Sequence, residues 1–150
     1  MDIEIAIEIK NVDADMIKPL RHAELRKGQD FSSTSYLRDN EVSTFHLAAN
    51  LDRKIVTCAT FYPEKSKNLN AIKSYRLRGL ATASSFQRKG YARELIIAAF
   101  LELKAKGADF VWCNARIIAL GFYKSIGFKI KGDQFDIETI GPHYFMYKEI

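Results

Sequence analysis

The sequence has few cysteines, histidines and prolines, and each shortage argues against a class of protein. Its 150 residues include 2 Cys, 3 His and 3 Pro. Cys58 and Cys113 both lie in apolar, strand-like runs, so we interpret them as reduced packing residues. No cysteines and histidines have the spacing of zinc ligands, and no metal site is expected. Without a proline- or glycine-rich linker, the chain is predicted to form one domain over residues 1–150.

Long hydrophobic runs are missing as well. The longest is Leu95–Leu101, whereas a membrane-spanning helix needs about 20 apolar residues. The first residues, Met1-Asp2-Ile3-Glu4, lack the basic and apolar regions of a secretory signal. We therefore expect a cytoplasmic protein with no membrane partner.

Acidic residues are absent between Lys65 and Arg93, although the whole chain has a net charge of only +5. This stretch contains Lys65, Lys67, Lys73, Arg76, Arg78, Arg88, Lys89 and Arg93. Such a field attracts polyanions, so coenzyme A and nucleic acid are both candidate partners, and a solvated basic face is the alternative. Nucleic acid is not expected, because exposed interleaved aromatics and a recognition motif are missing.

Hydrophobic periodicity predicts an α/β fold. Strands are expected at residues 3–9, 44–49, 54–61, 75–82, 109–114, 128–131 and 143–148. Helices are expected from the N-cap candidates at 11–15 to Gly28, from 91 to 106, and from 116 to 126. Residues 50–53 are predicted to form a hairpin turn, and 135–137 a short extended segment. The strands at 76–82 and 109–114 flank a helix, so they should be parallel.

The stretch from Tyr75 to Leu103 contains the strongest functional signal. A strand and a small polar turn lead into Gln87-Arg88-Lys89-Gly90-Tyr91-Ala92 and then into a helical pattern. The first amides of a helix lack intrahelical acceptors and carry partial positive charge, which suits a diphosphate. Gly90 is able to adopt a positive φ angle, and Arg88 and Lys89 add positive charge.

This hexad resembles the Q/R-x-x-G-x-G/A signature of the GNAT acyl-CoA N-acyltransferases. A second segment, with Ala119, Phe122, Tyr123, Gly127 and Phe128, resembles the family's A-x-x-F-Y-x-x-x-G-F element. Residues 112–116 and 141–147 further resemble a subgroup of small, functionally uncharacterised GNAT proteins. The resemblance covers essentially the whole chain. It implies the GNAT fold, a mixed and mostly antiparallel sheet with a central splayed parallel strand pair and helices on both faces.

The resemblance implies an N-acetyltransferase that moves an acetyl group from acetyl-CoA directly to a primary amine. The expected acceptor is a small molecule or amino-acid-like compound, and the expected assembly is a monomer or homodimer. A non-catalytic acetyl-CoA-binding module is the alternative. The residues expected to bind acetyl-CoA are Leu80, Ala81, Thr82, Gln87, Arg88, Lys89, Gly90, Tyr91, Ala92, Arg93 and Asn114. Asn114 is equally well explained as a turn residue that caps the next helix.

Tyr123 matches the tyrosine with which many GNAT enzymes protonate the leaving thiolate. Its alternative interpretation is a core aromatic beside Phe122. Candidates for a general base are His46, His143, Asp39, Glu41 and Glu138, and a water chain is the alternative. His143 ranks first because it follows Pro142 at a strand start and faces the acceptor side by family topology. Arg21, Arg26 and Arg116 are the candidates for binding an acidic group on the acceptor, although Arg21 and Arg26 are also explained as solvated helix charges.

Overall fold

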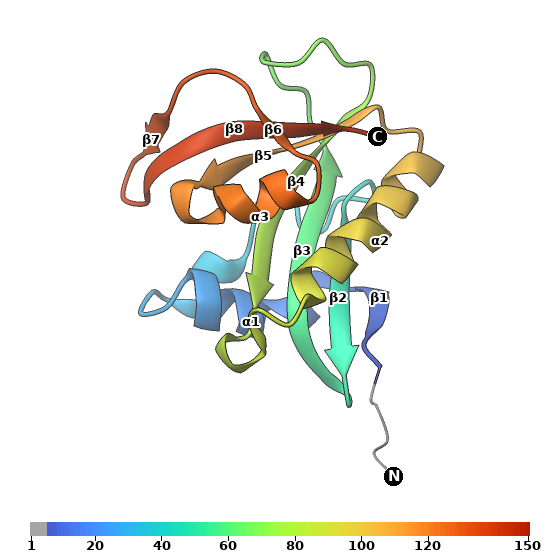
Figure 1. The fold of residues 1–150 in the computed structure, drawn as a ribbon. Helices are drawn as coiled ribbons and strands as arrows, with labels where there is room; N and C mark the ends of the chain where they lie inside the picture. Colours follow the sequence, from blue (N-terminus) through green and yellow to red (C-terminus); the bar gives the residue numbers. More distant parts are fainter. Residues whose placement is uncertain (1–5) are drawn as a thin grey trace. The chain divides into compact units, whose positions relative to one another are not determined.

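The structure, a computed structural model, describes residues 6–150 (Figure 1). These residues divide into two units. The first unit comprises the chain up to Tyr62 together with Arg78–Ala99. The second comprises Pro63–Leu77 and Phe100–Ile150. Strand β4 (Ser74–Thr82) and helix α2 (Tyr91–Ala105) each contribute residues to both units. The single domain inferred from the sequence remains a prediction.

The first unit contains strands in the order β1-β2-β3-β4. Their bounds are Glu8–Val12 for β1, Phe45–Leu51 for β2 and Lys54–Pro63 for β3. β2 pairs antiparallel with both β1 and β3. Asp52 and Arg53 join β2 to β3 with φ angles of 48° and 66°, the left-handed pair typical of a type I′ hairpin turn. The predicted hairpin is therefore confirmed.

Helix α1 (Ala14–Leu25) and the short 3-10 helix η1 (Phe31–Thr34) follow β1. Ile17 lies in a buried cluster with Ala48, Cys58 and Ala81. Met16 is 54% exposed, because the buried face of α1 runs through Ala14, Ile17 and Arg21. Pro19 lies in the second turn of α1, which begins at Ala14.

The predicted first strand differs from the observed one. Residues 3–5 of the expected segment lie outside the described residues. β1 spans Glu8–Val12 and pairs Ile9 with Ala49. Isoleucines recur at every second residue from Ile3 to Ile9, so the alternation begins ahead of the strand. The pattern alone therefore does not show at which residue β1 begins to pair with β2.

The second unit is built around β5 (Phe110–Arg116) and β8 (Gly141–Glu149), which pair antiparallel. β5 also pairs in parallel with the first part of β4, from Ser74↔Phe110 to Arg76↔Trp112, so the predicted parallel pair is confirmed. β6 (Lys129–Ile130) and β7 (Phe135–Ile137) both pair with β8. The extended segment expected at 135–137 is confirmed as β7.

The helix predicted at residues 116–126 is shorter than expected. β5 continues through Arg116, and a 3-10 turn, η3 (Ile117–Ala119), precedes helix α3 (Leu120–Ser125). The strand is longer because pairing with β8 extends to Arg116↔His143. Asn114 is therefore a strand residue paired with Phe145, and its interpretation as a helix-capping turn residue is wrong.

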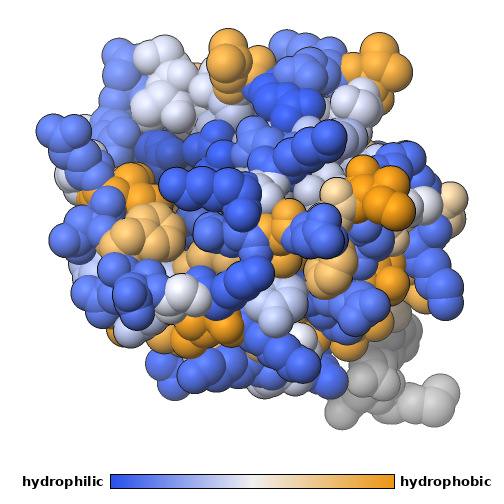
Figure 2. Space-filling view, turned by 90° about the horizontal axis from the view of Figure 1, so that it is seen from above, coloured by the Kyte–Doolittle hydropathy of each residue, from blue (hydrophilic) through white to orange (hydrophobic). Residues whose placement is uncertain are grey.

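Exposed large hydrophobic residues are spread along the described part of the sequence, from Met16 to Ile140. Figure 2 shows hydrophilic residues between the hydrophobic ones on the face that it presents, as expected for scattered apolar side chains. Within residues 6–150, no helix is long and apolar enough to cross a membrane. The same residues contain no group of three or more potential metal-binding side chains.

Candidate functional site

The loop between β4 and α2 forms a compact turn in the first unit. It continues from Thr82 through a 3-10 turn, η2 (Ser84–Phe86), to Tyr91 at the start of α2. Arg88 and Gly90 have positive φ angles of 61° and 85°. The Nε2 group of Gln87 donates to the carbonyl of Thr82 at 3.1 Å and ties the loop to the strand.

The start of α2 presents backbone amides suited to an anion. The amide of Glu94 donates to the carbonyl of Gly90 at 3.0 Å. This is the first hydrogen bond of the helix. Intrahelical acceptors are therefore lacking for the amides before it, those of Tyr91, Ala92 and Arg93. A Cβ atom at Gly90 would meet nothing within 4 Å. Gly90 is therefore favoured by its positive φ angle and not by crowding within the chain.

The charged side chains of this loop are exposed. Arg88 and Lys89 are both exposed to solvent. The Nζ atoms of Lys54 and Lys89 lie 5.3 and 5.7 Å from the ring centroid of Phe86, within the range of cation–π attraction. The loop therefore combines backbone donors with mobile positive charge, as the sequence predicts.

β4 is irregular just before the segment expected to hold the pantetheine arm. Gly79 has a φ angle of 65°, and its carbonyl accepts a hydrogen bond from the thiol of Cys58 at 3.7 Å. Ala81 is buried, whereas Leu80 and Thr82 are half-buried. Burial raises the pKa of Cys58 to about 12, so this thiol stays protonated.

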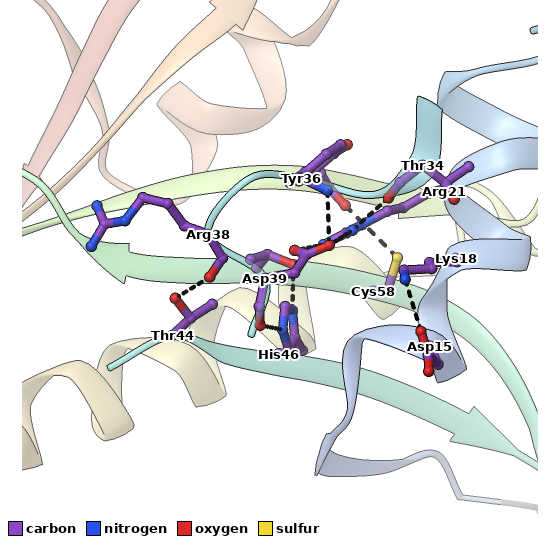
Figure 3. Close-up of polar contacts among 12 residues, drawn as sticks. Asp15, Lys18, Arg21, Thr34, Tyr36, Arg38, Asp39, Thr44, His46 and Cys58 are labelled. Atoms are coloured by element: carbon purple, nitrogen blue, oxygen red, sulfur yellow. Dashed lines mark hydrogen bonds and ion pairs between the residues drawn. The ribbon is translucent and has the colours of Figure 1, made fainter. Parts of the chain in front are cut away.

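Arg21 was expected to be solvated at the surface or to contact the acceptor, but it is fully buried, with an exposed fraction of 0%. Its Nη atoms donate to both carboxylate oxygens of Asp39 at 2.7 and 3.0 Å (Figure 3). They also donate to the carbonyl of Thr34 at 2.8 Å and to Oγ1 of Thr60 at 2.6 Å. The solvated interpretation is therefore wrong, because the loop after α1 folds over this side chain.

Two candidates for a general base, Asp39 and His46, belong to the same buried group. Nε2 of His46 donates to the carbonyl of Asp39 at 2.9 Å, and Nδ1 lies 2.8 Å from Oγ1 of Thr60. Burial lowers the pKa of His46, so Nδ1 accepts from Thr60 in the neutral ring. Burial alone would raise the pKa of Asp39, but hydrogen bonds from Arg21 and the Tyr36 amide lower it. Asp39 and His46 therefore form their hydrogen bonds with other buried groups of the first unit.

Three arginines of the first unit lie against the ring of Tyr36. The Cζ atoms of Arg21, Arg78 and Arg26 lie 3.8, 4.4 and 5.7 Å from its ring centroid. Arg26 was a predicted acceptor residue, whereas Arg78 and Tyr36 were not. The sequence offered one signal for Arg78, its place in the acid-free stretch, and none for Tyr36 in its polar loop.

Tyr123 lies in α3 of the second unit and is 7% exposed. The thiol of Cys113 lies near its hydroxyl. Burial, followed by the contact with Cys113, raises the pKa of Tyr123 well above its usual value. Phe122 and Phe128 hold the ring, with centroids 5.3 and 5.1 Å away. Tyr123 is therefore a protonated hydroxyl in an apolar setting.

The strand register brings Arg116 and His143 together. They are directly opposite in the β5–β8 ladder, so their side chains are neighbours on one face. Nδ1 of His143 lies 2.7 Å from the carbonyl of Gly141, to which it donates. In the neutral ring, Nε2 of His143 is then an acceptor. Phe135 stacks on this histidine, with centroids 6.1 Å apart.

Asn114 lies on the same face of β5 as Arg116, because side chains alternate along a strand. Cys113, which contacts Tyr123, faces the other side. The structure therefore places Arg116, His143 and Asn114 on one face of the ladder and the Tyr123 hydroxyl on the other.

The sequence model of the Acetyltransferase (GNAT) family matches residues 11–128. The chain belongs to the GNAT acetyltransferase family. It is 34% identical over 144 residues to the uncharacterized N-acetyltransferase YitI of Bacillus subtilis (strain 168), covering 96% of this chain and 97% of that protein. The GNAT recognition and the activity predicted from the sequence, an acetyl-CoA-dependent N-acetyltransferase, are thereby confirmed.

Solved structures agree with the GNAT fold. A putative N-acetyltransferase from Lactobacillus plantarum superposes with a TM-score of 0.77 at 18% identity, covering 96% of this chain and 98% of that one. An aminoglycoside 6'-N-acetyltransferase complexed with coenzyme A gives 0.77 at 15% identity, with 95% and 96% covered. The predicted fold class, a mixed and mostly antiparallel sheet with one parallel pair, is confirmed.

Proposed function

We propose that this GNAT enzyme transfers the acetyl group of acetyl-CoA directly to the primary amine of a small or amino-acid-like molecule. The observation that supports donor binding most strongly is the turn ahead of α2. There Arg88 and Gly90 adopt positive φ angles of 61° and 85°, and the first α2 amides lack intrahelical acceptors. A diphosphate fits these donors together with the exposed Arg88 and Lys89.

Acetyl-CoA supplies a thioester whose carbonyl carbon accepts the amine. The amine nitrogen forms the new bond, the carbon–sulfur bond breaks, and the amine proton has to leave. We assign the diphosphate to the loop Gln87–Arg93 and the pantetheine arm to the backbone of Leu80, Ala81 and Thr82. Backbone donors near Leu80 would stabilise the developing oxyanion, and Asn114 would bind an amide of the arm.

Tyr123 is proposed to give its proton to the departing sulfur. Its raised pKa keeps the hydroxyl protonated at neutral pH, as a general acid requires. The neutral thiol that the hydroxyl now contacts is a weak hydrogen-bond acceptor. Exchange of that contact for a thiolate would therefore be favourable.

His143 is proposed as the base that takes the amine proton through water, because it lies on the opposite face of the β5–β8 ladder from the Tyr123 hydroxyl. Donation from Nδ1 to the Gly141 carbonyl leaves Nε2 with a free lone pair in the neutral ring. Arg116, its neighbour across the ladder, would contact the acceptor. Among the other acceptor candidates, Arg26 is half-buried, whereas any role of the buried Arg21 would be exerted through Tyr36.

Gly90→Asp tests donor binding. It places a carboxylate at the helix start, where the favourable anion interaction amounts to about 2 kcal/mol. Affinity for acetyl-CoA, measured by calorimetry, should fall by about 30-fold or more. Gly132→Asp is the matched control, since Gly132 has the same φ of 85° and the same open surroundings. Equal affinities in the two variants would place the diphosphate elsewhere.

A panel of amines tests the acceptor. Release of the coenzyme A thiol is measured with amino acids, polyamines, amino sugars and peptides with a free N-terminus or lysine. Turnover of small amines over peptides supports the proposal. Turnover of peptides alone would overturn the small-molecule acceptor while leaving the acetyltransferase activity intact.

A further inference from the structure

Three guanidinium groups surround Tyr36 in the first unit, and they differ in their partners. Arg21 forms an ion pair with Asp39 at 2.7 Å. Arg26 donates to the carbonyl of its own neighbour, Leu25, at 3.1 Å. Within residues 6–150, Arg78 has the Tyr36 ring as a contact but no hydrogen bond or ion pair.

The positive charge around this ring is therefore only partly balanced. The three guanidinium carbons lie within 5.7 Å of the ring centroid, and Asp39 neutralises one of them. Glu24, another acid on α1, instead accepts from the amide and hydroxyl of Ser84 at 2.9 and 2.8 Å. Like charges this close repel one another, and a bound anion would remove that repulsion.

A buried donor without a partner lies beside the same ring. Nε of Arg21 is buried and forms no hydrogen bond within the described part of the chain. A Cβ atom built on Gly79 would lie 3.5 Å from this nitrogen and 3.2 Å from the Tyr36 hydroxyl oxygen. An unpaired buried donor is costly, so the hydrogen bonds to Thr34, Asp39 and Thr60 leave Arg21 incompletely satisfied.

Tyr36 is held in place by the buried ion pair. Its backbone amide donates to Oδ2 of Asp39 at 2.9 Å, and the same oxygen accepts from Arg21 (Figure 3). Arg21 and Asp39 therefore position the ring, while Arg26 and Arg78 remain half-buried. Half-buried arginines with unused donors are suited to planar, bidentate recognition of a carboxylate.

We infer that Arg78 and Arg26, held against Tyr36, bind a carboxylate carried by the amine acceptor. The inference rests on the proposed small-amine acceptor and narrows it to acidic amines, such as amino acids with a free carboxylate. Arg78 and Arg26 determine specificity here, whereas Arg21 and Asp39 are positioning residues.

The test compares each proteinogenic amino acid with its α-carboxamide, which keeps the amine but lacks the charge. The wild-type protein should prefer the acid in kcat/KM by about 10- to 100-fold, as expected for charge-assisted hydrogen bonds. Arg78→Gln should reduce this preference by at least about tenfold, because kcat/KM falls much more for the acid than for the amide. Arg78→Lys keeps the positive charge but loses the planar guanidinium group that binds a carboxylate through two parallel hydrogen bonds. It should therefore give an intermediate preference.

Lys27→Gln is the matched control, because Lys27 is exposed, adjacent to Arg26 and carries the same charge. Its acid preference should equal that of the wild type. KM for acetyl-CoA is measured in every variant. A raised acetyl-CoA KM in Arg78→Gln would assign this arginine to the donor's phosphates and overturn the inference.

Binding separates failure of this inference from failure of the proposed acceptor. Calorimetry with N-acetyl amino acids and their amides needs no turnover, and circular dichroism confirms that each variant is folded. Equal binding of acid and amide by the wild type, or an acid preference unaffected by Arg78→Gln, would overturn the carboxylate site. Turnover of neutral small amines without an acid preference would overturn it too, while leaving the small-amine acceptor standing.

Discussion

The first unit buries an ion pair, and the second buries a neutral contact between a tyrosine and a cysteine. Arg21 makes four hydrogen bonds of 2.6–3.0 Å to Thr34, Asp39 and Thr60. The hydroxyl of Tyr123 lies near Cys113, and burial raises the pKa of that thiol to about 12.

The difference indicates which group is free to take part in a reaction. Breaking a buried ion pair leaves an uncompensated charge, which is strongly unfavourable. A thiol is only a weak acceptor, so a hydroxyl that contacts it exchanges partners at little cost. The Arg21 cluster is therefore committed to the structure, whereas the Tyr123 hydroxyl can exchange its contact at little cost.

Asp39→Ala should have the largest effect. It leaves the guanidinium of Arg21 buried without its carboxylate and removes the acceptor of the Tyr36 amide. The free energy of unfolding, measured with urea, should fall by about 3–5 kcal/mol.

Glu41→Ala is the control, because Glu41 pairs with Arg38 at the surface at 2.9 Å. Removing this exposed pair should cost no more than about 1 kcal/mol. Equal losses in the two variants would show that the Arg21 cluster is not a special determinant of stability and would remove the contrast between the units.

Tyr123→Phe should have the next largest effect, on rate instead of stability. Loss of general-acid catalysis should lower kcat and kcat/KM equally, by about 10²-fold. Affinity for acetyl-CoA should be unchanged, because the ring still packs against Phe122 and Phe128. Steady-state kinetics and thermal melting measure the two effects.

Tyr147→Phe is the control for removing a tyrosine hydroxyl in the same unit, and its kcat should match the wild type. Wild-type turnover in Tyr123→Phe, together with a stability loss of about 1–3 kcal/mol, would make the Tyr123 hydroxyl structural. In that case both buried groups would serve stability alone.

The two buried groups also differ in how far the sequence predicted them. Tyr123 lies inside a contiguous motif, and so does the loop around Gly90, whose positive φ angle followed from local chain geometry. The partners of Arg21 are 13, 18 and 39 residues away in the sequence. No local pattern joins them, so Arg21 was expected to be solvated like any arginine on an amphipathic helix.

Positions that depend on strand ends were harder to predict for a similar reason. Asn114 was equally well explained as a turn residue, because the sequence does not show that β8 pairs with β5 as far as Arg116. That register, set by tertiary contacts, is what places Arg116 opposite His143. The motif therefore provides candidate residues for binding acetyl-CoA, whereas the pairing of Arg116 with His143 required the fold.

The smallest expected effect is a pH dependence from His46. Burial lowers its pKa in the folded protein, so between that pKa and about 6.5 the unfolded chain binds more protons. Stability should be complete above pH ~6.5 and decrease below it, by at most about 1.4 kcal/mol per pH unit.

Urea denaturation between about pH 7.5 and pH 5 measures this slope, since the lowered pKa of Asp39 acts only below about 3.9. His46→Gln should flatten the slope. An equally steep slope in His46→Gln would show that protons enter elsewhere and that the buried cluster tolerates a second positive charge.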